Sequence, residues 1–263
     1  NQNHASSDNN VFIGAEASVG GTGNRADNVA IGYRAWGSGG SANNIGGSEN
    51  IFIGTESGGG TWATGASDGN TAVGWNTMKG AMNGATINTA FGKNALLALT
   101  TGDYNTIVGG DSGKSINTGS HNSTLGADSL ADGTDAEGNV AIGSSAMYNS
   151  VSADNCVAIG RQAIGVGNNT IEGTVAIGYQ SLKELTSGAR NTAIGYQAGM
   201  GMTVGEDNVA FGYGALGGAS TSTANQRNTA IGVSSMAGTN AGAGNNVAIG
   251  YAALDGNLTS AAD

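Results

Sequence analysis

The sequence has no proline, a single cysteine, and few aromatic or charged residues. Of its 263 residues, 5% are aromatic, 11% are charged and 38% are hydrophobic. The absence of proline excludes collagen and proline-rich disorder, and the low charge content excludes a charge-driven disordered tail. The one cysteine, Cys156, excludes a framework of disulfides within the chain. The hydrophobic residues have too little bulk for a conventional core of this length, so small side chains must pack in a regular array instead.

Basic residues are also scarce, with nine against nineteen acidic residues and a net charge of −10. Duplex nucleic acid would be repelled by this balance, so we expect no nucleic-acid partner. The longest apolar run, Ala95 to Leu99, is far shorter than the roughly 20 residues of a membrane-spanning helix, so we expect no membrane insertion within this segment. The chain starts at Asn1 without Met, and residues 257–263 resemble the approach to another repeat. We therefore expect a fragment of a longer fibrous protein.

Glycine, in contrast, is abundant at 49 residues. It closes a unit that occurs fourteen times between Asn10 and Leu254, twelve times with the motif Asn-x-x-apolar-Gly and twice with another residue in place of the Asn. Ten of the thirteen intervals between closing glycines are 17 or 18 residues, and the longest is 22. No domain boundary interrupts the repeat, which predicts one repeat domain over residues 1–263. The closing glycines are Gly14, Gly32, Gly54, Gly74, Gly92, Gly109, Gly126, Gly143, Gly160, Gly178, Gly195, Gly212, Gly232 and Gly250.

The positions around each closing glycine predict an all-β fold, a parallel β-solenoid or β-roll of about fourteen rungs of 17 to 22 residues. The residue before the glycine is always Ile, Val, Leu or Phe, and the residue two positions earlier is Val, Ile, Thr or Ser. This period of two indicates a short strand whose two flanking side chains we expect to point into a narrow core. Small residues three positions past the glycine are expected to close the other wall. The main alternative is a strand-plus-helix repeat, with helical turns at segments such as Asn94–Leu99 and Tyr179–Leu185.

An asparagine precedes the strand in twelve of the fourteen units, and Cys156 and Thr174 replace it in the other two. Identical amides stacked at strand spacing can hydrogen-bond from coil to coil, so we predict a structural ladder. Its members are Asn10, Asn28, Asn50, Asn70, Asn88, Asn105, Asn122, Asn139, Asn191, Asn208, Asn228 and Asn246.

The middle strand position is alanine in ten units, and the expected alternation places it on the outside of the coil. An outward apolar stripe predicts a seam between chains. The alternative is that this row faces a second internal layer. The seam residues would be Ala30, Ala72, Ala90, Ala141, Ala158, Ala176, Ala193, Ala210, Ala230 and Ala248, and the exceptions in the column are Phe12, Phe52, Ile107 and Thr124.

The strings Asn28-Val-Ala-Ile-Gly32, Asn191-Thr-Ala-Ile-Gly-Tyr-Gln-Ala198 and Asn246-Val-Ala-Ile-Gly-Tyr251 resemble the head repeats of trimeric autotransporter adhesins. They are at least as similar to the Asn-Thr-Ala-Ile-Gly-Tyr-x-Ala-Leu repeats of bacteriophage tail fibres. The resemblance covers nearly the whole chain. It implies a left-handed β-roll, a homotrimer around one axis and a role in attachment to a surface. The repeat is longer than in adhesin heads, which favours the tail-fibre type.

Exposed aromatic residues are the candidate ligand contacts. Trp36, Trp62 and Trp75 lie near the two N-terminal insertions, where they would either stack on sugar rings or pack over the rod. Tyr179, Tyr196 and Tyr213 each follow a closing glycine in consecutive rungs, and we favour inter-chain packing over glycan contact for this row. The length variation falls in the segments 36–49, 58–69 and 217–227, which we expect to be loops on a binding face.

Catalytic and metal chemistry finds little support in the sequence. His4 and His121 are the only histidines, and neither a nucleophile elbow nor a phosphate loop is present. The acidic segment 132–137 does not follow a known calcium-loop spacing, so a solvated turn is favoured there over a calcium site. Cys156 is interpreted as a tolerated substitution in the asparagine column. We expect no enzyme activity, no metal and no cofactor.

These observations predict a non-catalytic fibrous adhesion or host-recognition module, extracellular on a bacterial surface or in a virion tail fibre. It would bind a cell-surface glycan or protein. A purely structural spacer is the alternative, and the uneven insertions favour the adhesion module. An ice-binding solenoid is a third hypothesis, disfavoured because threonine shares the column expected to point inward.

Overall fold

The computed structural model describes residues 9–19, 25–37, 46–62, 65–165, 170–218, 225–238 and 244–256. All regular secondary structure in these ranges is strand, and every strand is three residues long. Asn94–Leu99 and Tyr179–Leu185 form turns and no helix. In these ranges there is accordingly no helix long and apolar enough to cross a bilayer. The chain divides into two units, Asn1–Ala136 and Glu137–Asp263, and each is a parallel β-solenoid as predicted.

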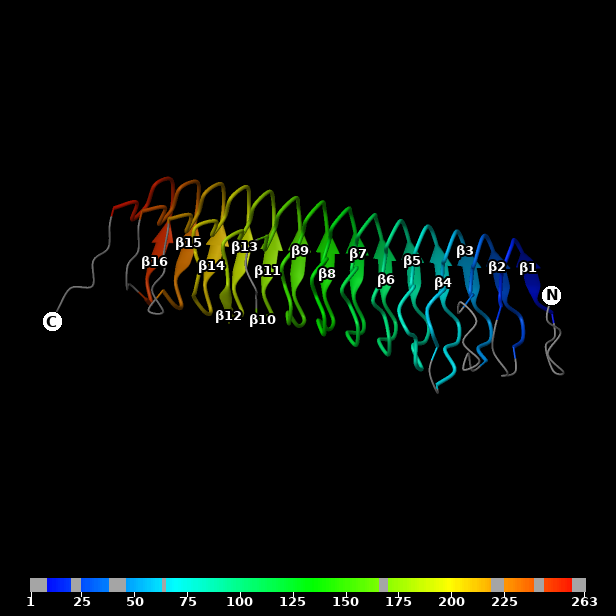
Figure 1. Ribbon diagram of the computed structural model, residues 1–263. Coiled ribbons are helices and arrows are strands. Elements are labelled where there is room, and N and C mark those ends of the chain that lie inside the picture. The colour runs from blue at the N-terminus through cyan, green and yellow to red at the C-terminus, as the bar shows by residue number, and fades with distance from the viewer. Residues whose placement is uncertain are drawn as a thin grey trace. The chain divides into compact units, whose positions relative to one another are not determined.

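The first unit contributes one strand from each coil to a single parallel sheet (Figure 1). Neighbouring strands pair in chain order and in one register, so that Val11 lies opposite Val29 and Ile31 lies opposite Ile53. The strands are β1 (Val11–Ile13), β2 (Val29–Ile31), β3 (Ile51–Ile53), β4 (Thr71–Val73), β5 (Thr89–Phe91), β6 (Thr106–Val108) and β7 (Ser123–Leu125).

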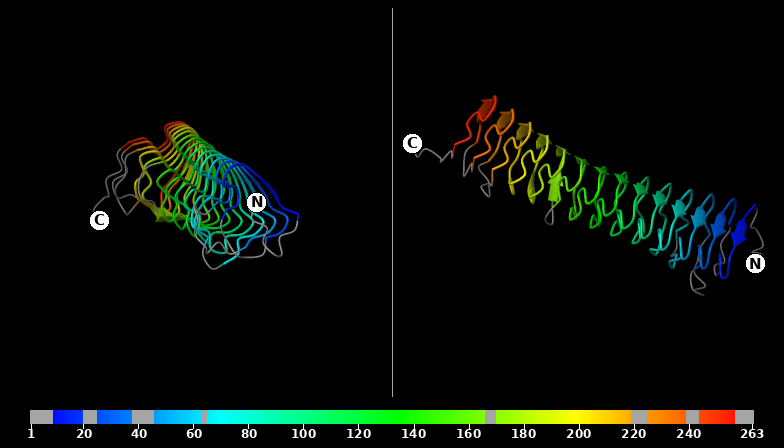
Figure 2. Two further views of the ribbon diagram at one scale, coloured as in Figure 1. Left: turned by 45° about the vertical axis from the view of Figure 1, so that its right-hand side comes forward. Right: turned by 90° about the horizontal axis from the view of Figure 1, so that it is seen from above.

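The second unit repeats this arrangement, as Figure 2 shows from two further directions. Its main sheet is formed by β8 (Val140–Ile142), β9 (Val157–Ile159), β11 (Val175–Ile177), β13 (Thr192–Ile194), β14 (Val209–Phe211), β15 (Thr229–Ile231) and β16 (Val247–Ile249). Two further strands, β10 (Thr170–Glu172) and β12 (Ser187–Ala189), pair in parallel as a separate small sheet on another side of the coil. This second sheet is absent from the sequence-based prediction.

Each coil turns through residues with positive φ at three fixed positions. They are the residue before the ladder asparagine and the residues two and four positions past the closing glycine, as at His121, Asp128 and Leu130 of one coil. The closing glycines themselves adopt φ between 125° and 144°, a region that only glycine enters easily. A Cβ on Gly109 would lie 2.2 Å from the carbonyl oxygen of Gly126 in the next coil. The closing position therefore requires glycine for both conformation and close backbone approach.

The alanine column lies inside the coil, so the prediction that it points outward is wrong. Nine of the ten alanines are 2% exposed or less, and Ala248 is 3% exposed. The flanking strand residues, predicted to point inward, are instead half-buried or exposed, as Val140 and Ile142 are on either side of the buried Ala141. The predicted alternation along the strand is confirmed, but its two faces are exchanged, because the middle residue is buried and the flanking residues point outward. Alanine allows the two walls of a thin coil to approach closely, and two bulky side chains per strand would not fit between them.

The opposite wall of the core is formed by the residues three and four positions past the glycine, as predicted. Ala95 and Leu96 are fully buried, and they face a coil interior that includes Ala90. In several coils size is compensated between the middle strand position and the position six residues later. Phe52 is matched by Gly58 and Ile107 by Gly113, whereas Ala90 is matched by Leu96. A Cβ on Gly58 would lie 2.6 Å from the Phe52 ring, so the two positions meet in the core.

The asparagines form a hydrogen-bonded ladder inside each unit. The Asn105 Oδ1 accepts hydrogen bonds from the backbone N–H of Asn122 and from its Nδ2, both at 3.0 Å. The same Nδ2 donates to the carbonyl oxygen of Ala136 at 2.7 Å. Each amide thereby satisfies polar groups of its own coil and of the next, which a buried turn needs. Cys156 and Thr174 occupy this column too, and the Cys156 N–H still donates to Asn139 Oδ1 at 3.0 Å.

Candidate binding surfaces

Two of the three tryptophans predicted as ligand contacts lie in the core instead. Trp36 is fully buried and Trp62 is 1% exposed. They pack with Phe12 and Phe52 in an aromatic cluster whose ring centroids are 5.4 to 6.1 Å apart. The buried Arg25 guanidinium lies 4.5 Å from the Trp36 ring and donates to Ser18 Oγ at 2.7 Å, and burial lowers the pKa of Arg25 to about 10. Neither tryptophan presents a ring face to a ligand, so this part of the prediction is wrong.

Trp75 is the exposed tryptophan, with 48% of its surface accessible. It directly follows Gly74, the glycine that closes the unit after β4. It therefore lies on the edge of the coil where the chain leaves the strand. The Nζ of Lys93, from the equivalent position of the next coil, lies 5.0 Å from the centroid of its ring. Trp75 therefore remains a candidate ligand contact.

The three consecutive tyrosines form a stacked ladder along the same edge of the second unit. The Tyr179 and Tyr196 ring centroids are 4.9 Å apart, and those of Tyr196 and Tyr213 are 5.3 Å apart. The Arg161 guanidinium covers the Tyr179 ring at 4.9 Å and donates to its hydroxyl at 2.9 Å. Both faces of Tyr196 are thus occupied, so a sugar ring cannot stack on it. The ladder exposes ring edges and hydroxyls, and Tyr213 is 55% exposed.

A polar row runs beside these aromatics, one residue further along each coil. Gln180 donates to Gln162 at 2.9 Å, and Gln197 donates to Gln180 at 3.0 Å. In the first unit the Asn94 side chain donates to Asp111 at 2.8 Å. Glu56, which belongs to the same row, forms an ion pair with Lys79 of the next coil. Because amides and charges line this edge in both units, it is a surface suited to contact with water or a polar ligand.

An extended apolar surface lies on the outer face of the strands, whose side chains sequence reasoning placed in the core. Side chains at the first and third strand positions project from it, and Leu125 and Phe211 are each 54% exposed. Soluble proteins rarely expose long apolar patches, so this strand face is a candidate contact surface. Its most exposed members are Val11, Ile13, Ile51, Phe91, Leu125, Ile142, Val209, Phe211, Ile231, Val247 and Ile249.

A short exposed ridge occupies the positive-φ position before the ladder asparagine in three consecutive coils of the first unit. Ile87 and Tyr104 are 54% and 51% exposed, and the Tyr104 and His121 rings stack at 5.1 Å. Glycine occupies the same position at Gly69. A β-branched residue with φ of 55° is strained, and sequence reasoning did not single out this ridge.

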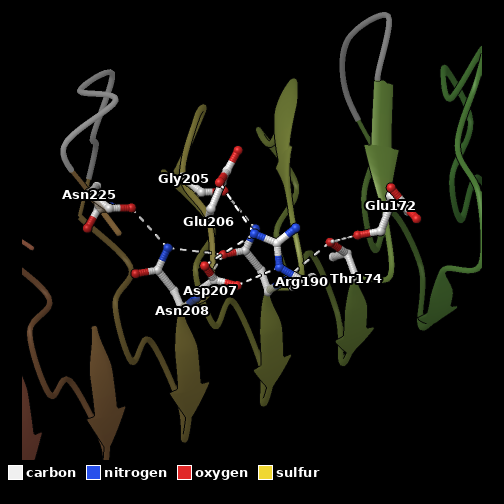
Figure 3. Close-up of polar contacts among 9 residues, drawn as sticks. Glu172, Thr174, Arg190, Gly205, Glu206, Asp207, Asn208 and Asn225 are labelled. Atoms are coloured by element: carbon white, nitrogen blue, oxygen red, sulfur yellow. Dashed lines mark hydrogen bonds and ion pairs between the residues drawn. The ribbon is translucent and has the colours of Figure 1, made fainter. Parts of the chain in front are cut away.

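The small sheet of the second unit carries a charged cluster centred on Arg190, drawn in Figure 3. The Arg190 Nε and Nη2 donate to the two carboxylate oxygens of Asp207 at 2.7 and 3.2 Å, and Glu206 Oε2 lies 3.5 Å from Nη2. This pairing lowers the pKa of Asp207, and the hydrogen bond to Asp207 raises the pKa of Arg190. A shallow hollow of about 300 Å³ lies beside the cluster, lined by residues that include Asp154, Glu172 and Glu206.

Catalytic and metal groups are sparse in the described ranges. Burial raises the pKa of the Cys156 thiol to about 11, so it is protonated at neutral pH and is a poor nucleophile. In the part of the chain that the structure describes, no three His, Cys, Asp or Glu side chains gather as a metal site would require, and this includes the acidic segment 132–137. Residues 38–45, 63–64 and 219–224 of the three predicted loop insertions lie outside the described residues.

Comparison with known proteins gave no match to a family, to a curated protein or to a solved structure.

Proposed function

We propose that the chain is a non-catalytic fibrous adhesion or host-recognition module that assembles as a homotrimer through its strand face. The uncovered strand face is the observation that carries this proposal. Two outward columns of Val, Ile, Leu, Phe and Thr, with one Ser at Ser123, follow the strands, while the alanines fill the coil interior. Apolar surface of this extent gains stability when a second copy covers it, at about 25 cal/mol per Å² buried.

The resemblance to tail-fibre and adhesin-head repeats supports three chains and a left-handed coil. The proposed seam differs from the one predicted from sequence, because the strand face replaces the alanine column. The polar edge with Trp75 and the tyrosine ladder stays outside the seam, since its charges and amides would be costly to bury. A receptor, either a cell-surface glycan or a protein, would bind at this edge and at the loops. The proposed location is extracellular, on a bacterial surface or in a virion tail fibre.

The molar mass in solution, measured by light scattering on a size-exclusion column, tests the assembly. A trimer would have three times the chain mass of 25.6 kDa, about 77 kDa. The variant Leu125→Glu/Phe211→Glu places one charge on the strand face of each unit and should give a monomer with unchanged β-sheet circular dichroism. The matched control Ala127→Glu/Ser144→Glu adds the same charges at the polar edge and should remain a trimer. A monomeric wild-type chain would overturn the proposed assembly.

Ice binding is a second candidate, because the structure reverses the reason for disfavouring it. Thr71, Thr89 and Thr106 begin three consecutive strands and share the outward column instead of the core. Valine and isoleucine interrupt this column, and the third strand position holds no threonine, which makes the array uneven. A monomer that shows thermal hysteresis, and loses it in Thr89→Asp, would support ice binding over adhesion.

A further inference from the structure

We propose that Trp75 and Lys93 form a binding site for a carboxylated sugar, such as a hexuronic or sialic acid residue of a surface glycan. This inference rests on the proposed function, because it names the ligand class that the adhesion module recognises. It follows from the exposure of Trp75, from the charge of Lys93 and from the edge of the coil on which both lie.

The exposed indole has no structural partner comparable to those of the other tryptophans. Trp36 and Trp62 are held by ring contacts in the core, whereas Trp75 makes no ring contact in the described ranges. Lys93 covers one face of its ring, which at an exposed site contributes only about 0.5–1 kcal/mol. Thr55 occupies the equivalent position of the preceding coil, and its side chain is too small to cover an indole. One face of the ring is therefore open to a ligand.

Lys93 carries a positive charge that no carboxylate balances among the described residues. Two other cations near this edge of the first unit are ion-paired, Arg34 with Glu16 and Lys79 with Glu56. An uncompensated ammonium is unusual in a chain whose net charge is −10. It attracts an anionic group to the edge of the indole, and a neutral ligand would make no use of it.

The two groups together select a sugar with a carboxylate. The hydrogens bonded to carbon on one face of a pyranose ring carry partial positive charge and pack against the negative face of an aromatic ring. To meet the carboxylate of a uronic or sialic acid, the flexible Lys93 side chain moves from the ring face to the ring edge, which gives up a contact worth only about 0.5–1 kcal/mol. The ammonium and the carboxylate then form a charge-assisted hydrogen bond. The amides of Asn76 and Asn94, which directly follow Trp75 and Lys93 in the chain, already pair with each other and with Asp111, so the selection rests on Trp75 and Lys93.

Binding to trigalacturonic acid, measured by isothermal titration calorimetry, tests the inference on the full chain. The methyl ester of the same trisaccharide is the matched ligand, because it keeps the rings and removes the charge. Sialyllactose and its methyl ester form a second such pair. We expect binding of the two acidic ligands and at least about tenfold weaker binding of their neutral counterparts, which corresponds to about 1.4 kcal/mol.

Substitutions then assign the site. Trp75→Ala and Lys93→Gln should each weaken binding of the acid by about tenfold, and Lys93→Arg should stay within about threefold because it keeps the charge. Lys183→Gln and Tyr251→Ala are the controls, since they remove a cation and an exposed aromatic ring elsewhere, and they should bind like the wild type. Unchanged melting temperatures would show that each variant folds.

Two outcomes would overturn the inference and leave the proposed function standing. One is a trimer that binds the neutral ligands as tightly as the acidic ones, and the other is acid binding that survives both Trp75→Ala and Lys93→Gln. A chain that binds neither of the two acidic ligands would also overturn the inference. A monomeric chain that binds the acids through Trp75 and Lys93 would instead reject the trimer and keep the sugar site.

Discussion

At the scale of single residues, the tightest constraint lies at the closing glycines. Gly109 has φ of 142°, and its missing Cβ leaves room for the backbone of Gly126 in the next coil. The neighbouring Gly110 has open space around the same atom position. Two adjacent glycines in one coil therefore differ completely in what they tolerate.

Gly109→Ala should lower the free energy of unfolding by more than about 3 kcal/mol, because it combines a strained φ with a backbone clash. Gly110→Ala should change it by less than about 1 kcal/mol, because nothing lies within 4 Å of the added methyl group. Urea unfolding followed by circular dichroism measures both values. Equal losses in the two variants would show that close approach between coils does not explain the glycine column.

The asparagine ladder gives the second prediction at this scale. Asn122→Asp keeps the shape of a fully buried side chain but removes the Nδ2 donor that reaches Asn105 Oδ1 and the carbonyl oxygen of Ala136. The carboxylate would face two acceptors, so we expect a loss of about 3 kcal/mol or more. Asn155→Asp makes the same chemical change at an exposed position and should cost less than about 1 kcal/mol. Chemical denaturation of the pair at neutral pH compares them, and a similar stability of the two would contradict a supporting role for the ladder.

At the scale of the coil, the core is a match between the middle strand residue and the residue six positions later. Phe52→Ala alone should cost about 3–5 kcal/mol through the cavity it leaves. Gly58→Leu alone should also destabilise, because its Cβ would lie 2.6 Å from the Phe52 ring. The double variant recreates the Ala90 and Leu96 pairing of another coil.

The double variant Phe52→Ala/Gly58→Leu should therefore be at least about 2 kcal/mol more stable than the sum of the single changes predicts. Combining Phe52→Ala with Gly113→Leu, which lies in a different coil, is the control and should give additive losses. Thermal and urea unfolding of the three single variants and the two double variants complete the comparison. Additivity within the Phe52 and Gly58 pair would mean that the two positions do not share the core.

The same match explains how far the fold was predictable from sequence. The repeat length, the strand positions and the small residues past the glycine follow directly from the motif, and so does the asparagine column. The facing of the strand does not follow, because an alternation such as Val140-Ala141-Ile142 defines two faces without saying which is inside. The large-for-small exchange between Phe52 and Gly58 was the signal that could have decided it, since residues that share a core must keep their total volume.

The candidate sites were predictable only in part, for a related reason. Trp36 stands in a column that holds Leu, Met or Ile in nine of the other thirteen coils, so its position in the repeat indicated burial more strongly than its nearness to an insertion indicated exposure. Trp75 stands in the column of Lys93 and Tyr179, which is outward throughout. Lys93 was overlooked because its importance depends on its 5.0 Å contact with the Trp75 ring in the neighbouring coil.

At the scale of the whole molecule, each unit is stabilised by contacts between successive coils, as expected of a solenoid. The inner surfaces are filled by small residues and the amide ladder, while the strand face of each unit remains uncovered. Assembly would therefore be decided by the outer columns and stability of the single chain by the inner ones. The strand-face variant Leu125→Glu/Phe211→Glu separates these two properties, because it should change the molar mass without changing the fold.

The placement of the tryptophans also determines how the protein can be observed. All three lie in the first unit, two of them sealed among aromatic rings and the third at the surface. Emission from Trp36 and Trp62 should be blue-shifted and resist quenching by iodide, whereas Trp75 should be quenched readily. The intrinsic fluorescence thus contains two independent optical signals, one that follows unfolding of the first unit and one that responds to whatever occupies the surface beside Lys93.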